Sequence, residues 1–97
     1  MFVEVDLSSE SHKVWQKKIS TYIRLAVSGE FARLFSRAQF RVLVIADSER
    51  RMENLRKLVS KSTDKIFWFS TLSRIKASGI QASVWLRPTN SQPRPLV

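Results

Sequence analysis

The sequence predicts an α/β fold in which a mixed sheet carries helices on its faces, in the order β-α-β-α-β-β. Strand-like segments alternate with helix-like segments, which is typical of sheets with parallel neighbours. The segment 40–46 is nearly continuous in apolar, mostly β-branched residues, as expected of a central strand covered on both faces. We therefore expect one α/β domain over residues 1–87, followed by an extended Pro-rich tail over residues 88–97.

The first expected element is a short strand over residues 2–6, because polar and apolar residues alternate there. A period of two places Glu4 and Asp6 on one side with Phe2, and Val3 and Val5 on the other. Both carboxylates therefore share one face of the strand. The serines that follow are suited to a turn and to a helix cap.

An amphipathic helix is expected over residues 12–28, with Ser9 or Ser11 as its N-cap and Gly29 just after its end. Lys18 falls inside the apolar arc of this helix, where a lysine is rare unless it reaches solvent or meets a carboxylate. The opposite, solvated face carries three further cations: Lys13, Lys17 and Arg24.

The remaining elements are expected in chain order: a short helix at 30–38, a strand at 40–46, a helix at 48–61 capped at 47–48, a strand at 66–70, a turn or short helix at 71–77, and a strand at 82–86. Helical spacing places Arg50, Asn54, Lys57 and Lys61 on one face of the helix at 48–61. That stripe predicts either an ordinary solvated face or a surface that contacts phosphates.

Composition excludes several classes of function. The chain has no cysteine, one histidine and two glycines, so a disulfide framework, a Cys-ligated metal, a multi-His site and a Gly-rich phosphate loop are all excluded. The net charge of +9 predicts an anionic partner, and nucleic acid is the first choice. The longest apolar run, 42–46, is too short to cross a membrane, so we expect a cytoplasmic protein with no membrane contact.

One constellation could carry chemistry. Glu4 and Asp6 on one strand face could hold Mg²⁺, which prefers oxygen ligands, and Lys18 nearby could stabilise charge that develops on a phosphate. These three residues are the candidate catalytic set of a metal-dependent nuclease, with the two carboxylates as the metal ligands. The alternative is a structural salt bridge between Lys18 and one of the two carboxylates.

The segment 4–11, Glu-Val-Asp-Leu-Ser-Ser-Glu-Ser, resembles the E-x-D-R-G-T-E-S segment of the bacterial replication-relaxation family. The resemblance continues through the Lys18 and Tyr22 spacing and through the blocks at 40–44, 48–55, 67–71 and 84–86. It implies a role on plasmids or other mobile elements, in replication and DNA relaxation. The sequence departs from the family at 7–9, where Leu-Ser-Ser replaces Arg-Gly-Thr.

The same region is similar to the core of PD-(D/E)XK-type nucleases. That similarity implies that Glu4 and Asp6 match the acidic pair, with the lysine relocated onto the helix as Lys18. The upstream strands of such nucleases would precede Met1, so we expect a truncated C-terminal module that is inactive by itself.

These observations predict a DNA-binding module of a plasmid replication or relaxation protein. Its phosphate contacts are expected from Arg41, Arg50, Arg51, Lys57, Lys61, Arg74 and Lys76. The alternatives are the Mg²⁺-dependent nuclease, and an oligomerisation or docking domain that pairs with a second copy, or with a partner chain that supplies missing strands.

Overall fold

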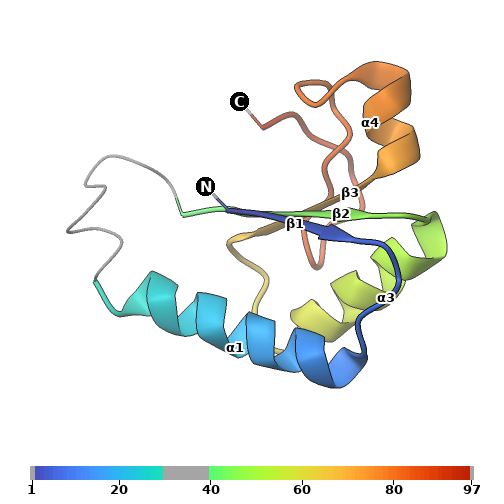
Figure 1. Ribbon diagram of the computed structural model, residues 1–97. Helices are drawn as coiled ribbons and strands as arrows, with labels where there is room; N and C mark the ends of the chain where they lie inside the picture. The colour runs from blue at the N-terminus through green and yellow to red at the C-terminus, as the bar shows by residue number, and fades with distance from the viewer. Residues whose placement is uncertain (1, 30–39, 97) are drawn as a thin grey trace.

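The computed structural model describes residues 2–29 and 40–96, and it contains a small parallel sheet with helices on both faces (Figure 1). The strands are β1 (Phe2–Asp6), β2 (Val42–Ala46) and β3 (Phe67–Thr71), and the helices are α1 (His12–Val27), α3 (Glu49–Ser60) and α4 (Leu72–Ser78). The observed order is β-α-β-α-β-α. The short helix predicted at 30–38 lies outside the described residues.

The expected α/β class is confirmed, but the expected mixed sheet is wrong for these strands. β2 lies between β1 and β3, and both pairings are parallel, with Glu4 opposite Val44 and Val44 opposite Phe69. β1 and β2 are each followed by a helix before the next parallel strand begins, which is the crossover connection that parallel strands require.

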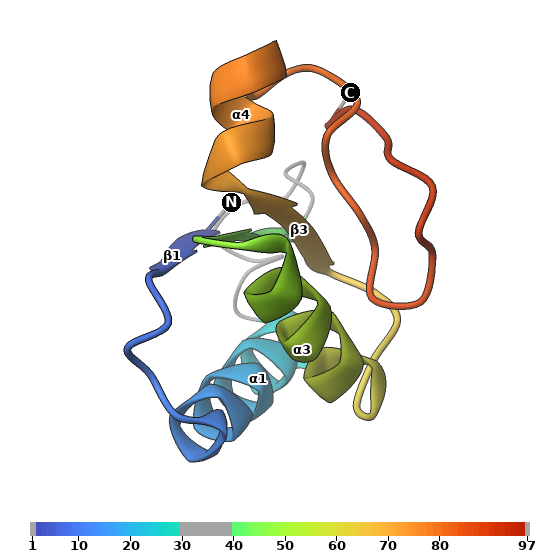
Figure 2. The same cartoon turned by 90° about the vertical axis from the view of Figure 1, so that its right-hand side faces the viewer.

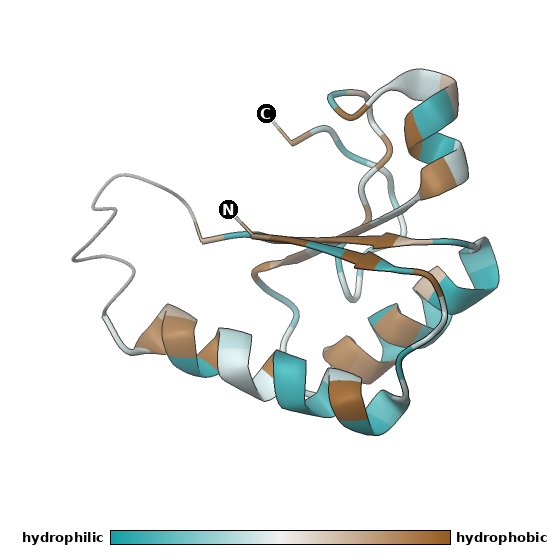
Figure 3. Cartoon of the chain, in the orientation of Figure 1, coloured by the Kyte–Doolittle hydropathy of each residue, from teal (hydrophilic) through white to brown (hydrophobic). Residues whose placement is uncertain are grey.

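Two layers of different composition cover the sheet (Figures 1 and 2). α1 and α3 lie side by side on one face and bury a core with β2 and β3 that includes Trp15, Leu55 and Phe69. α4 and the C-terminal segment lie on the other face, over a smaller core that contains Trp68 and Trp85. Hydropathy colouring shows mostly apolar strands and helices in which apolar and hydrophilic residues are mixed along the ribbon (Figure 3).

The central strand of the sheet and its β1 edge differ in burial. All five residues of β2 are buried, which confirms the prediction of a central strand. β1 alternates as expected, and its polar side faces α1, whereas Val3 and Val5 on the other side are 56% and 53% exposed. α4 and the C-terminal segment cover β2 and β3 but leave this side of β1 open.

Polar caps set the helix starts. The side-chain hydroxyls of Ser11, Ser48 and Thr71 each accept a hydrogen bond from the backbone N–H three residues later. Ile66 was expected to begin the third strand, but its φ of 61° is left-handed, so the strand begins at Phe67. Gly29 follows α1 with a φ of 83°, a conformation that glycine adopts without strain.

The strand expected at 82–86 does not form as a continuous strand. Leu86 forms an isolated antiparallel bridge with Phe69, and Trp85 forms another with Arg94. The ladder stops after these pairs because Pro88 and the later prolines have no backbone N–H to donate. The C-terminal segment thus returns to the domain, and Leu96 packs on the core around Trp68.

Candidate functional site

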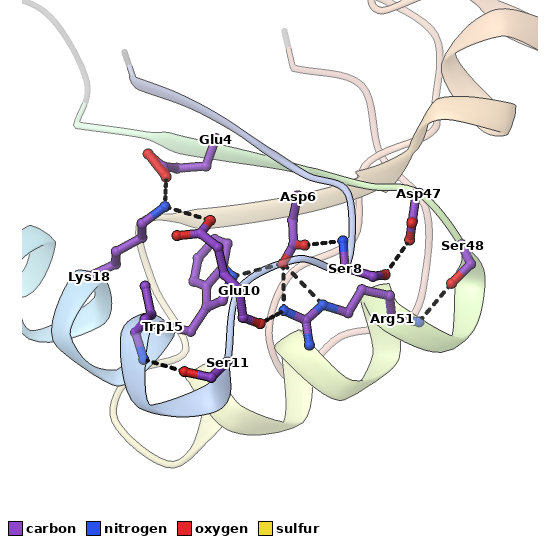
Figure 4. A network of polar contacts seen from close by, with 11 residues as sticks. Glu4, Asp6, Ser8, Glu10, Ser11, Trp15, Lys18, Asp47, Ser48 and Arg51 are labelled. Carbon is purple, nitrogen blue, oxygen red and sulfur yellow. Dashed lines mark hydrogen bonds and ion pairs between the residues drawn. The ribbon is translucent and has the colours of Figure 1, made fainter.

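Lys18 lies between two carboxylates, as its place in the apolar arc predicted (Figure 4). Its Nζ donates to Glu4 Oε1 at 2.6 Å and to Glu10 Oε1 at 2.8 Å. Tyr22, one turn further along α1, donates its hydroxyl to the second oxygen of Glu4 at 2.9 Å. The ammonium also lies 5.2 Å from the ring centroid of Trp15. One lysine therefore joins β1, the following loop and α1.

Asp6, whose side chain is fully buried, is the centre of a second set of contacts (Figure 4). Its Oδ2 accepts hydrogen bonds from Trp15 Nε1 at 2.7 Å and from Arg51 Nε and Nη2 at 3.0 and 2.8 Å. Its Oδ1 accepts from the backbone N–H of Ser8 at 2.6 Å. Arg51 Nη2 also donates to the backbone carbonyl of Glu10 at 2.6 Å. Asp6 thus ties α1 and α3 to the end of β1.

The electrostatics of this network follow from its burial and its pairing. Burial and the hydrogen bond to Glu4 raise the pKa of Tyr22 to about 12. Burial alone would lower the pKa of Lys18, but hydrogen bonds to Glu10 and Glu4 outweigh it, so the pKa of the ammonium is raised. Lys18 therefore stays charged and Tyr22 stays protonated at neutral pH.

The carboxylates predicted to hold Mg²⁺ are both engaged by donors of the protein itself. Asp6 accepts from a guanidinium, an indole and a backbone amide, and Glu4 accepts from an ammonium and a phenol. Within residues 2–29 and 40–96, no group of three or more His, Asp or Glu side chains could hold a metal ion. The magnesium site therefore stays a prediction.

The basic residues predicted to contact nucleic acid fall into two groups. The first group is engaged within the fold. Arg51 is held in the Asp6 network, and Arg74 pairs with Glu49 at 2.7 and 2.8 Å. The guanidinium of Arg41 lies 4.8 Å from the centroid of the Trp68 ring, and it donates a hydrogen bond to the backbone carbonyl of Leu96.

The second group is exposed and has no ion pair with any described residue. Arg50 and Lys57 lie on α3 and Lys61 is its C-cap, on the stripe that helical spacing predicted. Lys76 is exposed on α4, on the opposite side of the sheet (Figure 1). The structure therefore brings together part of the predicted set and separates Lys76 from it.

The outer sides of the two neighbouring helices form one basic surface, which we call the α1–α3 surface. It carries six exposed cations, Lys13, Lys17, Arg24, Arg50, Lys57 and Lys61. A groove of about 250 Å³ lies between the helices, lined by His12, Asn54, Lys57, Leu58 and Lys61. It adjoins a second groove of about 190 Å³, which shares Leu58 and Lys61. None of the residues that line these grooves is acidic.

Sequence reasoning did not include α1 in the nucleic-acid interface. Lys13, Lys17 and Arg24 were interpreted as a solvated face, yet they line a single depression on the outer side of α1. His12 was given no role, although it lies in the groove against α3. A sequence signal exists for the lysines, because the spacing of 13, 17 and 24 matches the i, i+4, i+7, i+11 stripe on α3.

No family model, curated protein or solved structure matches this chain. Among the described residues, no helix combines the length and the apolar character that crossing a membrane requires.

Proposed function

We propose that the α1–α3 surface binds the phosphate backbone of duplex DNA. The observation that supports this proposal is that the exposed cations of the α1–α3 surface, on two adjacent helices, have no carboxylate partner among the described residues. When unpaired lysines and arginines on one face neutralise phosphates, the cations condensed on the DNA are released, and this release drives binding. The resemblance to the replication-relaxation family adds the expectation that the DNA belongs to a plasmid or another mobile element.

The rest of the charge distribution supports a free anion-binding surface. Most carboxylates of the described residues are already in ion pairs, at Glu4, Asp6, Glu10, Glu49 and Glu53. The depression and grooves of the α1–α3 surface contain no carboxylate. A phosphate that approaches this surface therefore meets ammonium, guanidinium, amide and hydroxyl groups without a competing negative charge.

The aromatic residues favour duplex DNA over a single strand. Proteins that bind single strands without sequence preference stack bases on exposed aromatic side chains. In the described part of the chain every aromatic side chain is buried or half-buried, and several of them form the core, Trp15, Phe67, Phe69 and Trp85. Contact with the backbone of a duplex requires cations alone.

The proposal is tested by fluorescence anisotropy with a labelled duplex over a series of salt concentrations. We expect log K to fall linearly with log salt concentration, with a slope of about −0.9 for each phosphate neutralised. The double variant Lys57→Gln/Lys61→Gln should bind roughly ten-fold more weakly and flatten the slope by about two.

The matched control is Lys76→Gln, which removes the same charge from the opposite side of the sheet. It should leave both the affinity and the slope close to those of the wild type. If Lys76→Gln weakens duplex affinity as much as Lys57→Gln or Lys61→Gln alone, only the net charge of the protein matters. Affinity that does not depend on salt would overturn the proposal.

A further inference from the structure

We propose that Arg87 and Arg94, which lie beside Trp68, form a site for one phosphate group in its dianionic form. The site lies in the layer that α4 and the C-terminal segment build, on the face of the sheet opposite to α1 and α3 (Figure 2). It is therefore separate from the α1–α3 surface, and it does not depend on the proposed DNA contact.

The fold brings three arginines from separate segments together around Trp68. Arg41 directly precedes β2, and its guanidinium reaches the Trp68 ring on the neighbouring strand. Arg87 comes directly after the residue that bridges to β3, and Arg94 forms a further bridge with Trp85. The charges at positions 41, 87 and 94 therefore act on one another only in the folded chain.

Two of these guanidinium groups share one indole ring. The Cζ atoms of Arg41 and Arg87 lie 4.8 and 4.6 Å from the centroid of the Trp68 ring. Each contact is favourable, because the face of an indole attracts a cation. The ring carries no negative charge, so two half-buried like charges are held close together without a counter-charge from it.

The hydrogen bonds of Arg87 do not supply a counter-charge either. Its Nη2 donates to the backbone carbonyl of Asp64 at 3.3 Å, and its buried Nε has no hydrogen-bond partner among the described residues. In the part of the chain that the structure describes, no carboxylate forms an ion pair with Arg87 or Arg94. The guanidinium of Arg87 is thus partly withdrawn from water and incompletely paired.

The electrostatics of Arg87 agree with this geometry. Burial lowers its pKa, the carboxylate of Asp64 opposes that effect, and the charges of Arg41 and Arg94 add to it. A guanidinium nevertheless stays protonated in proteins, so the repulsion persists at neutral pH. A bound anion would relieve it.

The number and the shape of the free charges indicate which anion fits. Arg87 and Arg94 offer two positive charges that no described carboxylate pairs with, and a phosphate monoester carries about two negative charges at neutral pH. The planar guanidinium presents paired N–H donors that match phosphate oxygens. A dianionic phosphate group therefore compensates both charges.

The site is tested by NMR through the indole N–H resonance of Trp68, which the variant Trp68→Phe identifies among the three tryptophans. Inorganic phosphate is added at pH 8, while potassium chloride is adjusted to hold the ionic strength constant. We expect a saturable shift of this resonance and one phosphate bound per chain in isothermal titration calorimetry. Acetate, which carries a single charge, should bind roughly ten-fold more weakly.

Variants at the two arginines separate the site from a general effect of charge. Arg94→Gln changes an exposed side chain, so it should leave urea unfolding unchanged and weaken phosphate binding roughly ten-fold. Arg87→Gln should remove the saturable response. Arg24→Gln removes an exposed guanidinium from α1 and is the matched control, which should bind phosphate as the wild type does.

Phenyl phosphate distinguishes the two sources of such a group. If it binds as inorganic phosphate does, the site accepts phosphate esters, and if only inorganic phosphate binds, the ligand is the free ion. The proposal is overturned by equal phosphate affinities of the wild type and Arg94→Gln, by a shift that does not saturate, or by acetate that binds as tightly as phosphate.

Discussion

Two charged regions of this protein differ in what their charges contact. In the network around β1, each charged side chain meets an opposite charge, and Asp6 is completely withdrawn from solvent. On the α1–α3 surface, the cations are exposed and have no carboxylate partner among the described residues. Charges of the first kind are committed to the fold, because removing one leaves a buried partner unpaired. Charges of the second kind are available to a ligand.

The largest effect that would test this contrast is expected at Asp6. Asp6→Asn leaves the guanidinium of Arg51 mostly buried without a counter-charge, so the free energy of unfolding should fall by about 3–5 kcal/mol. Urea denaturation followed by tryptophan fluorescence measures the change. A loss below about 1 kcal/mol, the value typical of an exposed pair, would show that this network is not structural.

A smaller effect, on binding and not on stability, is expected on the α1–α3 surface. Lys13→Gln/Lys17→Gln removes two cations that contact no carboxylate, so the free energy of unfolding should change by no more than about 0.5 kcal/mol. Duplex affinity should nevertheless fall several-fold, with a salt slope reduced by about two. If the affinity stays at the wild-type value, the interface is confined to α3.

The network around Lys18 should be visible in alkaline solution. Tyr22 is the one tyrosine of the chain, so its ionisation can be followed by ultraviolet absorbance, and we expect a midpoint at about pH 12 in the folded protein. The pKa values of Tyr22 and Lys18 are both raised on folding, so the stability they provide is present below about pH 10 and is lost as the pH rises above it.

Glu4→Gln provides the matched test of that assignment. The neutral amide removes the carboxylate that both groups share, so the ionisation midpoint of Tyr22 should move toward its ordinary value near 10. An unchanged midpoint in this variant would attribute the raised pKa of Tyr22 to burial alone.

The smallest effect is expected at the surface pair of Glu49 and Arg74. The hydrogen bond from Arg74 lowers the pKa of Glu49, so this stabilisation is present above the ordinary carboxyl pKa and is lost as the pH falls below it. The carboxylate is more than half exposed, and Glu49→Gln should therefore cost about 0.2–1 kcal/mol in thermal or urea unfolding at neutral pH. A cost as large as that of Asp6→Asn would contradict the contrast between exposed and buried pairs.

Several features were predictable from the sequence because they depend on residues close together in the chain. Alternation identified β1 and its carboxylate face, and a β-branched run identified the central strand β2. The serine caps also follow from local pattern. So does the pairing of Lys18 with a carboxylate, since Glu10 is eight residues away and Glu4 fourteen. The physical reason is periodicity: spacing along a strand or helix decides which side chains share a face.

Only the tertiary structure decided which charges are paired and which are free. Arg51 meets Asp6 across 45 residues, and no local pattern separates it from its neighbour Arg50, which stays exposed. The groove that joins His12 to Lys57 exists because α1 and α3 pack on the same face of the sheet. The parallel order of the strands sets that arrangement, and it depends on contacts between segments far apart in the chain. The sequence by itself determined the elements and the excess of positive charge, whereas packing determined where that charge is available.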